Sequence, residues 1–360
     1  MTGNPFAGFV NTTDWNFTIE DYIAPTITDH SPKTPPDAPL NTNLTLTFNE
    51  PVRRGSGSIN IQPSQGNAVT IPVADTERIR IAGNTVTITP GSFASNATVN
   101  VTVPAGAFTD LADNPLAAAF QWTFKVVDID IPFVTRYSPA DDSTNVPVNR
   151  RLVMVFNKPV RKNTGSITIT VNGQSRPPIP VASAAVTIGA DQETVTIDPF
   201  SAQFAAFPSE ATVFVTMPPG VFVDLSGNAN AFPGTSSPTT WNFTIADVLP
   251  PQLTSQLPAN GATGVPVDAE LVLAFNEPVT IGAATDSVTI AQSTGTRERI
   301  AMSDPRVRIS GSTVRITPGR NFDSEATVTV QVPATALQDR SGNRLAAVIG
   351  WNFRAADIFP

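Results

Sequence analysis

The feature that most constrains this chain is a two-residue alternation of apolar and polar side chains that recurs in three successive copies. In the first copy, Leu44, Leu46 and Phe48 alternate with threonines. The counterparts in the other copies are Leu152, Met154 and Phe156, and Leu271, Leu273 and Phe275. Such alternation is typical of strands that bury one face, whereas an amphipathic helix repeats about every 3.6 residues. Because 34 prolines and 22 glycines also punctuate the joins between these segments, we expect an all-β fold.

Three motifs recur in the same order and set the length of the repeat. A Trp-x-Phe triplet recurs about every 110 residues, beginning at Trp15, Trp122, Trp241 and Trp351. The motif Phe-Asn-x-Pro-Val begins at Phe48, Phe156 and Phe275. The motif Asp-Leu-x-x-Asn begins at Asp110 and Asp224, and an arginine replaces its leucine after Asp339. A sequence with such a period is typical of an array of like domains.

The phase of these motifs predicts where the domains begin and end. We expect residues 1–25 to be the last strand and linker of a preceding repeat, because they carry a triplet and its aspartate without the strands that precede them in the other copies. Three complete domains are expected at 26–131, 132–249 and 250–360. About seven short strands in each is typical of an immunoglobulin-like β-sandwich. Because the linkers are short and contain proline, we expect an elongated, semi-rigid rod, cut from a longer array.

The ordered set of motifs also carries a resemblance to a known family. Residues 138–149 read Ser-Pro-Ala-Asp-Asp-Ser-Thr-Asn-Val-Pro-Val-Asn, and a strand, Phe-Asn-x-Pro-Val, Asp-Leu-x-Gly-Asn and Trp-x-Phe follow. This set resembles the bacterial SbsA-type Ig-like domain, in three copies that cover essentially the whole chain. The resemblance implies an extracellular spacer or assembly role, since the family occurs in S-layer proteins and other large surface or secreted bacterial proteins. A shared fold by itself implies no activity.

Composition excludes several classes of function. The chain has no cysteine, so thiol chemistry and thiolate-held zinc are excluded. Its one histidine, His30, has no clustered partner with which to act as a catalytic base. The net charge of −8 argues against nucleic-acid binding, and no segment reaches the ~20 apolar residues of a membrane helix. We therefore expect no enzyme, no nucleic-acid partner and no membrane insertion in this segment, in which no secretion signal is visible.

Antiparallel strands would bring the linker aspartate and two of the motifs to the end of each sandwich where the chain enters. The groups expected to meet there are Asp21, Asn49, Glu50, Asp110 and Asn114; Asp128, Asp130, Asp224 and Asn228; and Asp247, Glu277 and Asp339. Oxygen ligands of this kind suit Ca²⁺, which takes about six to eight of them. The sequence therefore raises the hypothesis of calcium at the domain junctions, where it would stiffen the array.

A metal-free interpretation stands beside the calcium one. Aspartate and asparagine are favoured in turns because their side chains cap backbone amides, so the sequence Asp-Leu-x-Gly-Asn suits a turn that holds no ion. This is the simpler interpretation. Lys158 stands where the other copies have glutamate, which removes a ligand and adds a repelling charge. A metal at the second junction would then depend on Asp128 and Asp130.

Departures from the repeat predict where a partner would bind. The second copy lengthens two loops and adds phenylalanines to them: Phe200, Phe204, Phe207 and Phe232. These either cover the open end of the sandwich, which we favour, or contact a partner chain or a neighbouring domain. Four arginines of the third copy either protect an edge strand or dock a surface polysaccharide: Arg297, Arg299, Arg306 and Arg308. An unpaired strand at residues 12–20 would allow insertion into the sheet of another molecule.

Two classes of function remain. The first is a structural segment of a bacterial surface or extracellular protein: a stalk, an adhesin shaft, or a subunit of an S-layer or filament, with neighbouring copies or adjacent repeats as partners. The second is an accessory module of a secreted enzyme, binding carbohydrate. That second class requires exposed aromatic side chains on one sheet, whereas the tryptophans of the triplets are expected in the core.

Overall fold

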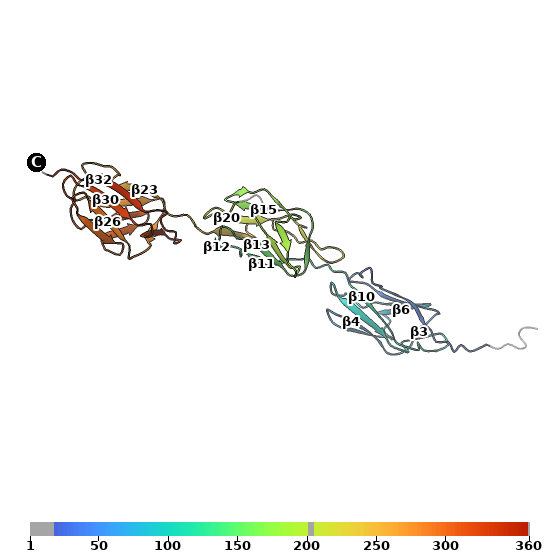
Figure 1. Ribbon diagram of the computed structural model, residues 1–360. Coiled ribbons are helices and arrows are strands. Elements are labelled where there is room, and N and C mark those ends of the chain that lie inside the picture. The colour runs from blue at the N-terminus through green and yellow to red at the C-terminus, as the bar shows by residue number, and fades with distance from the viewer. Residues whose placement is uncertain (1–17, 201–204, 359–360) are drawn as a thin grey trace, which may run out of the picture. The chain divides into compact units, whose positions relative to one another are not determined.

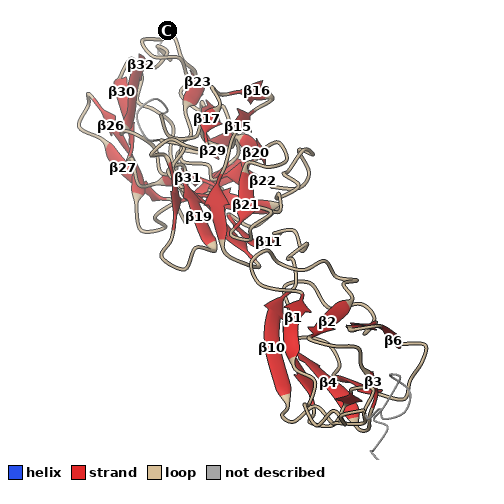
Figure 2. Cartoon of the chain, turned by 90° about the vertical axis from the view of Figure 1, so that its right-hand side faces the viewer, coloured by secondary structure: helices blue, strands red, loops and turns tan. Residues whose placement is uncertain are grey.

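The structure, a computed structural model, describes residues 18–200 and 205–358. The regular secondary structure of these residues consists of β-strands, and Figure 2 accordingly shows strands and loops without a blue helix. No helix that could cross a membrane occurs in this part of the chain. The strands form three groups in succession along the chain (Figure 1), which we call the first, second and third domains. The all-β prediction is confirmed, whereas the hypothesis of a free strand at 12–20 rests largely on residues outside the described range.

The first domain is a sandwich of two four-stranded antiparallel sheets. Its strands are β1 (Ile27–Ser31), β2 (Leu44–Phe48), β3 (Arg53–Arg54), β4 (Ser58–Pro63), β5 (Val69–Pro72), β6 (Ile79–Ala82), β7 (Thr85–Ile88), β8 (Thr98–Val103), β9 (Phe108–Thr109) and β10 (Phe120–Lys125). One sheet has the order β1-β2-β7-β6 and the other β10-β8-β4-β5, while β3 pairs with β9.

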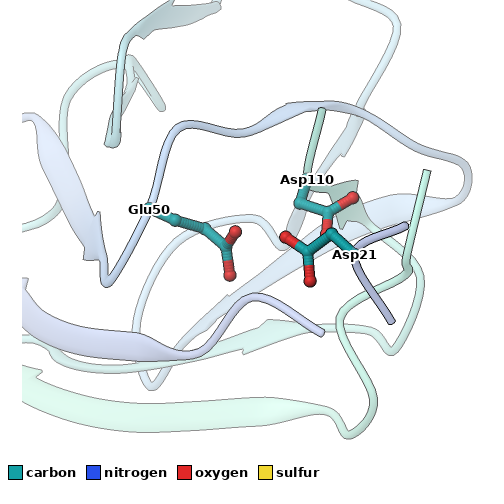
Figure 3. Close-up of side chains that lie close together, drawn as sticks. All are labelled: Asp21, Glu50 and Asp110. Atoms are coloured by element: carbon teal, nitrogen blue, oxygen red, sulfur yellow. The ribbon is translucent and has the colours of Figure 1, made fainter. Parts of the chain in front are cut away.

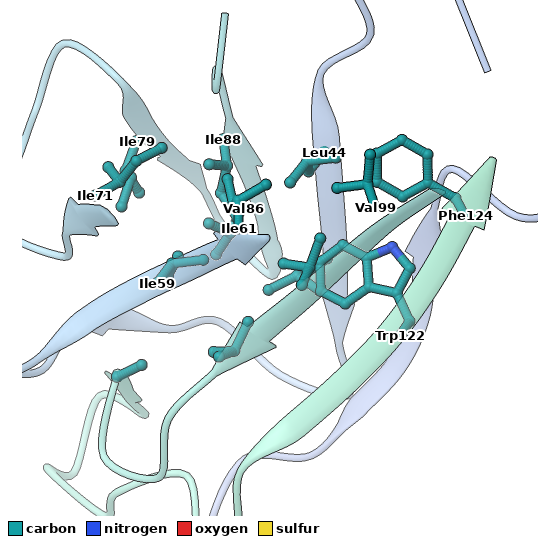
Figure 4. Packing of buried hydrophobic residues seen from close by; sticks show 14 of the residues in the cluster. Leu44, Ile59, Ile61, Ile71, Ile79, Val86, Ile88, Val99, Trp122 and Phe124 are labelled. Atoms are coloured by element: carbon teal, nitrogen blue, oxygen red, sulfur yellow. The ribbon is translucent and has the colours of Figure 1, made fainter. Parts of the chain in front are cut away.

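The alternation in the sequence builds the core of this sandwich. Leu44, Leu46 and Phe48 of β2 are at most 1% exposed, and the threonines between them are half-buried. Figure 4 shows side chains of both sheets, among them Leu44 of one sheet and Trp122 of the other, pointing into one shared core. Each fully buried aliphatic side chain stabilises the fold by about 1.5–3 kcal/mol. Burial on one face of each strand therefore explains why the strands pair in this register.

The second domain repeats this plan with two extra strands. Its strands are β11 (Val134–Ser138), β12 (Ser143–Val146), β13 (Leu152–Phe156), β14 (Val160–Lys162), β15 (Ser166–Val171), β16 (Gln174–Ser175), β17 (Ile179–Pro180), β18 (Val186–Ile188), β19 (Thr194–Ile197), β20 (Thr212–Thr216), β21 (Phe222–Asp224) and β22 (Asn242–Ile245). The sheet orders are β11-β13-β19-β18 and β12-β22-β20-β15-β16, with β17 also on β15 and a separate β14-β21 pair. The strand β12 runs parallel to its neighbour, β22.

The third domain has the same plan as the first. Its strands are β23 (Leu253–Leu257), β24 (Leu271–Phe275), β25 (Val279–Ile281), β26 (Ser287–Gln292), β27 (Arg297–Ala301), β28 (Val307–Ser310), β29 (Thr313–Ile316), β30 (Thr327–Val332), β31 (Leu337–Asp339) and β32 (Ile349–Arg354). The sheets are β23-β24-β29-β28 and β27-β26-β30-β32, beside the pair β25-β31.

A short strand pair in each domain brings together the Phe-Asn-x-Pro-Val motif and the motif that begins with Asp110, Asp224 or Asp339. In the first domain β3 directly follows Phe-Asn-x-Pro-Val, β9 directly precedes Asp110, and Arg53 lies opposite Thr109. In the third domain Val279 lies opposite Asp339 itself. The two main sheets of the first domain already hold eight strands, against about seven expected, and the small pair adds two more. The small pairs hold the two polar loops side by side, so they position the candidate site.

The added phenylalanines of the second domain are mostly interior. Phe207 and Phe232 are 2% and 3% exposed, and the ring of Phe200 packs edge-on against Phe207 with centroids 5.2 Å apart. The burial of Phe207 and Phe232 agrees with the covering interpretation, and contact with a partner chain or a neighbouring domain stays a prediction. Phe204 lies outside the described residues.

The remaining departures also find their places in the structure. Arg297 and Arg299 lie on β27 and Arg308 lies on β28, and both strands are sheet edges. Arg306 instead forms ion pairs with neighbouring carboxylates. The imidazole of His30 packs against the indole of Trp122, with ring centroids 5.5 Å apart, and burial lowers the pKa of His30. The edge-protection interpretation of the arginines therefore agrees with the sheet order.

Candidate metal centres

Three carboxylates from separate segments converge in the first domain. Asp21 precedes β1, Glu50 follows β2 and Asp110 follows β9. One carboxylate oxygen from each lies within 4.8 Å of the others. Figure 3 shows the three side chains pointing toward one another. Asp21 and Glu50 also line an open hollow, so these two carboxylates are accessible from solvent, whereas Asp110 is buried behind them.

Hydrogen bonds hold two of these carboxylates in place. The Oδ1 atom of Asp21 accepts the backbone N–H of Ile23 at 2.9 Å. The Oδ1 atom of Asp110 accepts the N–H groups of Ala112 and Asn114, each at 2.8 Å. The side-chain amide of Asn114 then donates to Asp110 Oδ2 and to the carbonyl of Asp21, both at 2.7 Å. Asn114 therefore joins the linker to the loop after β9.

Hydrogen bonds keep the carboxyl group of Asp110 ionised although it is buried. This side chain is 1% exposed, and burial alone would raise its pKa. The hydrogen bonds from the side chain and backbone of Asn114 and from the backbone of Ala112 outweigh burial, so the pKa of Asp110 lies below its usual value. Three acidic groups thus meet at one point with the innermost of them ionised at neutral pH.

The third domain contains the same cluster, built from Asp247, Glu277 and Asp339 within the same 4.8 Å limit. Asn343 takes the part of Asn114: its side-chain amide donates to Asp339 Oδ2 at 2.8 Å and to the carbonyl of Asp247 at 3.2 Å. Burial and the negative charges of Asp247 and Asp339 raise the pKa of Glu277. Burial and the like charges around it therefore disfavour the ionised form of Glu277.

In the second domain a lysine takes the place of the glutamate. The Nζ atom of Lys158 donates to Asp128 Oδ2 at 2.9 Å, to Asp224 Oδ2 at 3.0 Å and to the backbone carbonyl of Asp130 at 2.7 Å. Asp224 is 1% exposed. Its burial would raise its pKa, but hydrogen bonds from Ser226, Asn230 and Lys158 lower it to about 2. A fixed ion pair therefore replaces the acidic cluster.

Two predicted ligands have other roles. The side-chain oxygen of Asn49 accepts the N–H of Thr26 at 2.6 Å, so it caps the backbone beside the cluster. Asn228 was aligned with Asn114 on motif spacing, but the structure gives that position to Asn230. The amide of Asn230 donates to Asp224 Oδ2 and to the carbonyl of Asp128, both at 2.9 Å. The loop of the second domain is two residues longer, and the spacing therefore selected the wrong asparagine.

A serine that sequence reasoning missed contacts each linker from the side of the preceding domain. Ser95 Oγ donates to Asp128 Oδ1 at 3.4 Å and accepts the N–H of Ile129 at 2.9 Å. Ser209 makes the same pair of contacts with Asp247 and Val248, both at 2.9 Å. These serines begin a Ser-x-Ala-Thr motif that recurs in all three copies. That recurrence was the available signal.

Comparison with known proteins identifies the domains. The family described as bacterial Ig-like domain matches residues 21–126, 128–245 and 247–355. The chain belongs to this family. Bacterial Ig-like repeats of this kind are typical of surface proteins, and the matched ranges account for almost the whole described chain as Ig-like domains.

The other comparisons add only distant likeness. No curated protein matches the chain. Among solved structures, an I-band fragment of titin is 8% identical with a TM-score of 0.39, covering 94% of this chain and 99% of that one. The N-terminal eight Ig domains of the Down Syndrome Cell Adhesion Molecule are 12% identical with a TM-score of 0.32, covering 94% and 37%.

The matched ranges also locate the clusters. Asp21, Asp128 and Asp247 are the first residues of the three ranges, and the other members of each cluster lie in the same range. Each cluster therefore belongs to a single bacterial Ig-like domain, whose first residues it ties to two loops. The carboxylate oxygens of the two acidic clusters lie close enough together that they could hold a metal ion.

Proposed function

We propose that this chain is a structural segment of a bacterial cell-surface or extracellular protein, in which the domains act as a semi-rigid spacer or assembly unit. Neighbouring repeats or further copies of the same protein would be its partners. The two acidic clusters would bind Ca²⁺ and fix the entry segment of the first and third domains.

The observation that carries the spacer proposal is the way the linker aspartates are held. Asp128 accepts a hydrogen bond from Ser95, which precedes it, and its carbonyl accepts one from Asn230, which follows it. Asp247 is held in the same way by Ser209 and Asn343. One residue separates consecutive matched ranges, so little chain is left between these contacts. A linker that is bonded on both sides has few conformations, which favours stiffness.

The calcium proposal is supported by donor type, number and accessibility. Each acidic cluster offers three carboxylates, and either or both oxygens of each can coordinate. Ca²⁺ suits such sites because it accepts variable geometry and all-oxygen ligands, whereas Zn²⁺ favours nitrogen and sulfur. Extracellular calcium modules bind with dissociation constants of about 0.1–1 mM, so a cluster of three carboxylates suits a site of this class.

Small-angle X-ray scattering of the whole chain tests the spacer proposal. We expect a narrow distribution of maximum dimensions in the wild type and a broader one after Ser95→Ala combined with Asn230→Ala, which removes the bonds on both sides of Asp128. Ser303→Ala, at an exposed position of the third domain, is the matched control and should change nothing. A wild-type profile as broad as that of the double variant would contradict the proposal.

Thermal melting in calcium and in chelator tests the metal. At a free calcium concentration about 100 times the dissociation constant, binding to the folded state adds about 2.7 kcal/mol of stability. We therefore expect the first and third domains to melt several degrees higher in calcium. Identical melting curves would remove calcium from the proposal and leave the spacer role to be judged by scattering alone.

A further inference from the structure

The three clusters share one backbone frame. In each, Oδ1 of the linker aspartate accepts the N–H of the residue two positions later, at 2.9 Å, 2.9 Å and 3.0 Å. In each, an asparagine amide bridges the second aspartate to the carbonyl of the linker aspartate. Only the third member changes, and it is Glu50, Lys158 or Glu277 at the same place after Phe-Asn. The second domain therefore shows the same backbone frame with a lysine in place of the glutamate, and it can be compared directly with the other two domains.

The lysine shows where a cation lies in this frame. The ammonium group of Lys158 has three donors and contacts three oxygens, those of Asp128, Asp130 and Asp224, at 2.7–3.0 Å. Its side chain is 19% exposed. The equivalent oxygens in the first domain are the carboxylates of Asp21 and Asp110 and the carbonyl of Ile23. Glu50 would add a fourth group to the same position.

Charge gives an independent match. The first and third clusters each bring three carboxylates together, so one bound divalent cation would leave a single negative charge. In the second domain two carboxylates face one ammonium, which also leaves a single negative charge. Burial alone would lower the pKa of Lys158, but its bonds to Asp128 and Asp224 outweigh burial and raise it. The pKa of Lys158 thus lies above its usual value, so its ammonium group is charged at neutral pH.

We infer that Lys158 is a built-in counter-cation, which occupies in the second domain the position that a divalent metal ion occupies in the first and third. The inference rests on the proposed calcium sites for its metal half. The second domain then keeps its entry segment fixed without metal, and the chain binds two divalent ions instead of three. Removal of calcium would loosen the entry segments of the first and third domains and leave that of the second domain unaffected.

Charge exchange in the full chain tests this assignment, with bound calcium counted by equilibrium dialysis. We expect two ions for the wild type, three for Lys158→Glu, one for Glu50→Lys and two for Lys158→Met. Three ions in the Lys158→Glu protein would show that the second frame becomes a metal site once a carboxylate replaces the ammonium group. A wild type with two ions and a Lys158→Glu protein that also keeps two would overturn the inference.

Hydrogen exchange in chelator supplies a readout that needs no metal. The backbone amides of Asn230 and Asn114 bond to Asp224 and Asp110, so their exchange reports on the two frames. We expect the Asn230 amide to exchange about tenfold faster in Lys158→Met, and the Asn114 amide to exchange more slowly in Glu50→Lys. Unchanged exchange in both variants would overturn the role of Lys158.

The two readouts separate the inference from the proposed function. A wild type that binds no calcium would end the calcium proposal and, with it, the claim that lysine replaces a metal. In that case the exchange rates in chelator still decide whether Lys158 is the counter-cation that holds its own frame. Lys158→Met carries this decision even where Lys158→Glu does not fold.

Discussion

The three core tryptophans differ in one hydrogen bond, and this difference predicts different costs for the same substitution. The indole N–H of Trp241 donates to the carbonyl of Pro139 at 2.9 Å. The indole nitrogens of Trp122 and Trp351 are also buried, but among the described residues they have no acceptor. Substitution by phenylalanine removes the N–H group at all three positions and keeps an aromatic ring in the core.

The magnitude follows from the two hydrogen-bonding situations. In the second domain, Trp241→Phe breaks a bond and leaves the Pro139 carbonyl buried without its partner, which costs about 1–3 kcal/mol beyond the lost packing. In the other two domains the same change removes a buried donor that has no partner, which offsets part of the packing loss. We therefore expect Trp241→Phe to cost about 2 kcal/mol more than Trp122→Phe or Trp351→Phe. That difference corresponds to about 30-fold in the unfolding equilibrium.

Hydrogen exchange of the whole chain, read by mass spectrometry, measures the three domains separately. The reporters are the amides of β10, β22 and β32, the last strand of each domain, whose exchange reflects opening of its own sandwich. The Trp122 and Trp351 variants are matched controls for the loss of indole volume. Equal losses of protection in all three variants would refute the argument, as would a larger loss in the first or third domain.

Three further predictions concern charge and backbone. The pKa of Asp224 lies at about 2 against a usual 3.8, so ionised Asp224 adds about 2 kcal/mol to the free energy of unfolding above pH 4, and this contribution is lost as pH falls toward 2. When stability is measured against pH, the Asp224→Asn protein should therefore lack this fall between pH 4 and pH 2. The raised pKa of Glu277 means that stability in chelator falls as pH rises through that pKa, so Glu277→Gln should raise the melting temperature of the third domain at pH 7 in chelator and abolish its response to calcium. A Cβ on Gly282 would lie 2.4 Å from the carbonyl oxygen of Thr335, so Gly282→Ala should lower the free energy of unfolding by at least about 2 kcal/mol, whereas Gly227→Ala, with open space around it, should lie within about 0.5 kcal/mol of wild type in urea titration.

The fold was predictable from the sequence because its signal is periodic and repeated. Leu44, Leu46 and Phe48 specify one buried strand face, and two further copies of the same alternation leave little room for another interpretation. The meeting of Asp21 and Asp110 was also predictable, because strand direction alone brings their loops to one end. These inferences need only the period and the order of the segments.

The details that failed depend on distances that no period encodes. Asn230 lies in a loop lengthened by two residues, so motif spacing pointed to Asn228 instead. Phe207 and Phe232 were ambiguous because an apolar side chain in a loop can cover its own domain or a partner, and only packing decides. Ser95 was overlooked because its motif is short and polar, although it recurs in all three copies.

Lys158 shows most clearly why side-chain reach must accompany sequence comparison. Beside two aspartates, a lysine appears from the sequence to repel a metal ion and so to weaken the site. In the structure its chain is long enough to place the ammonium between Asp128 and Asp224, 2.9 Å and 3.0 Å from their oxygens, so it supplies the positive charge itself. On our inference, a single substitution at this position would change the source of the cation and leave the surrounding frame unchanged. An array built from such domains would then set its demand for metal one domain at a time, without a change of fold.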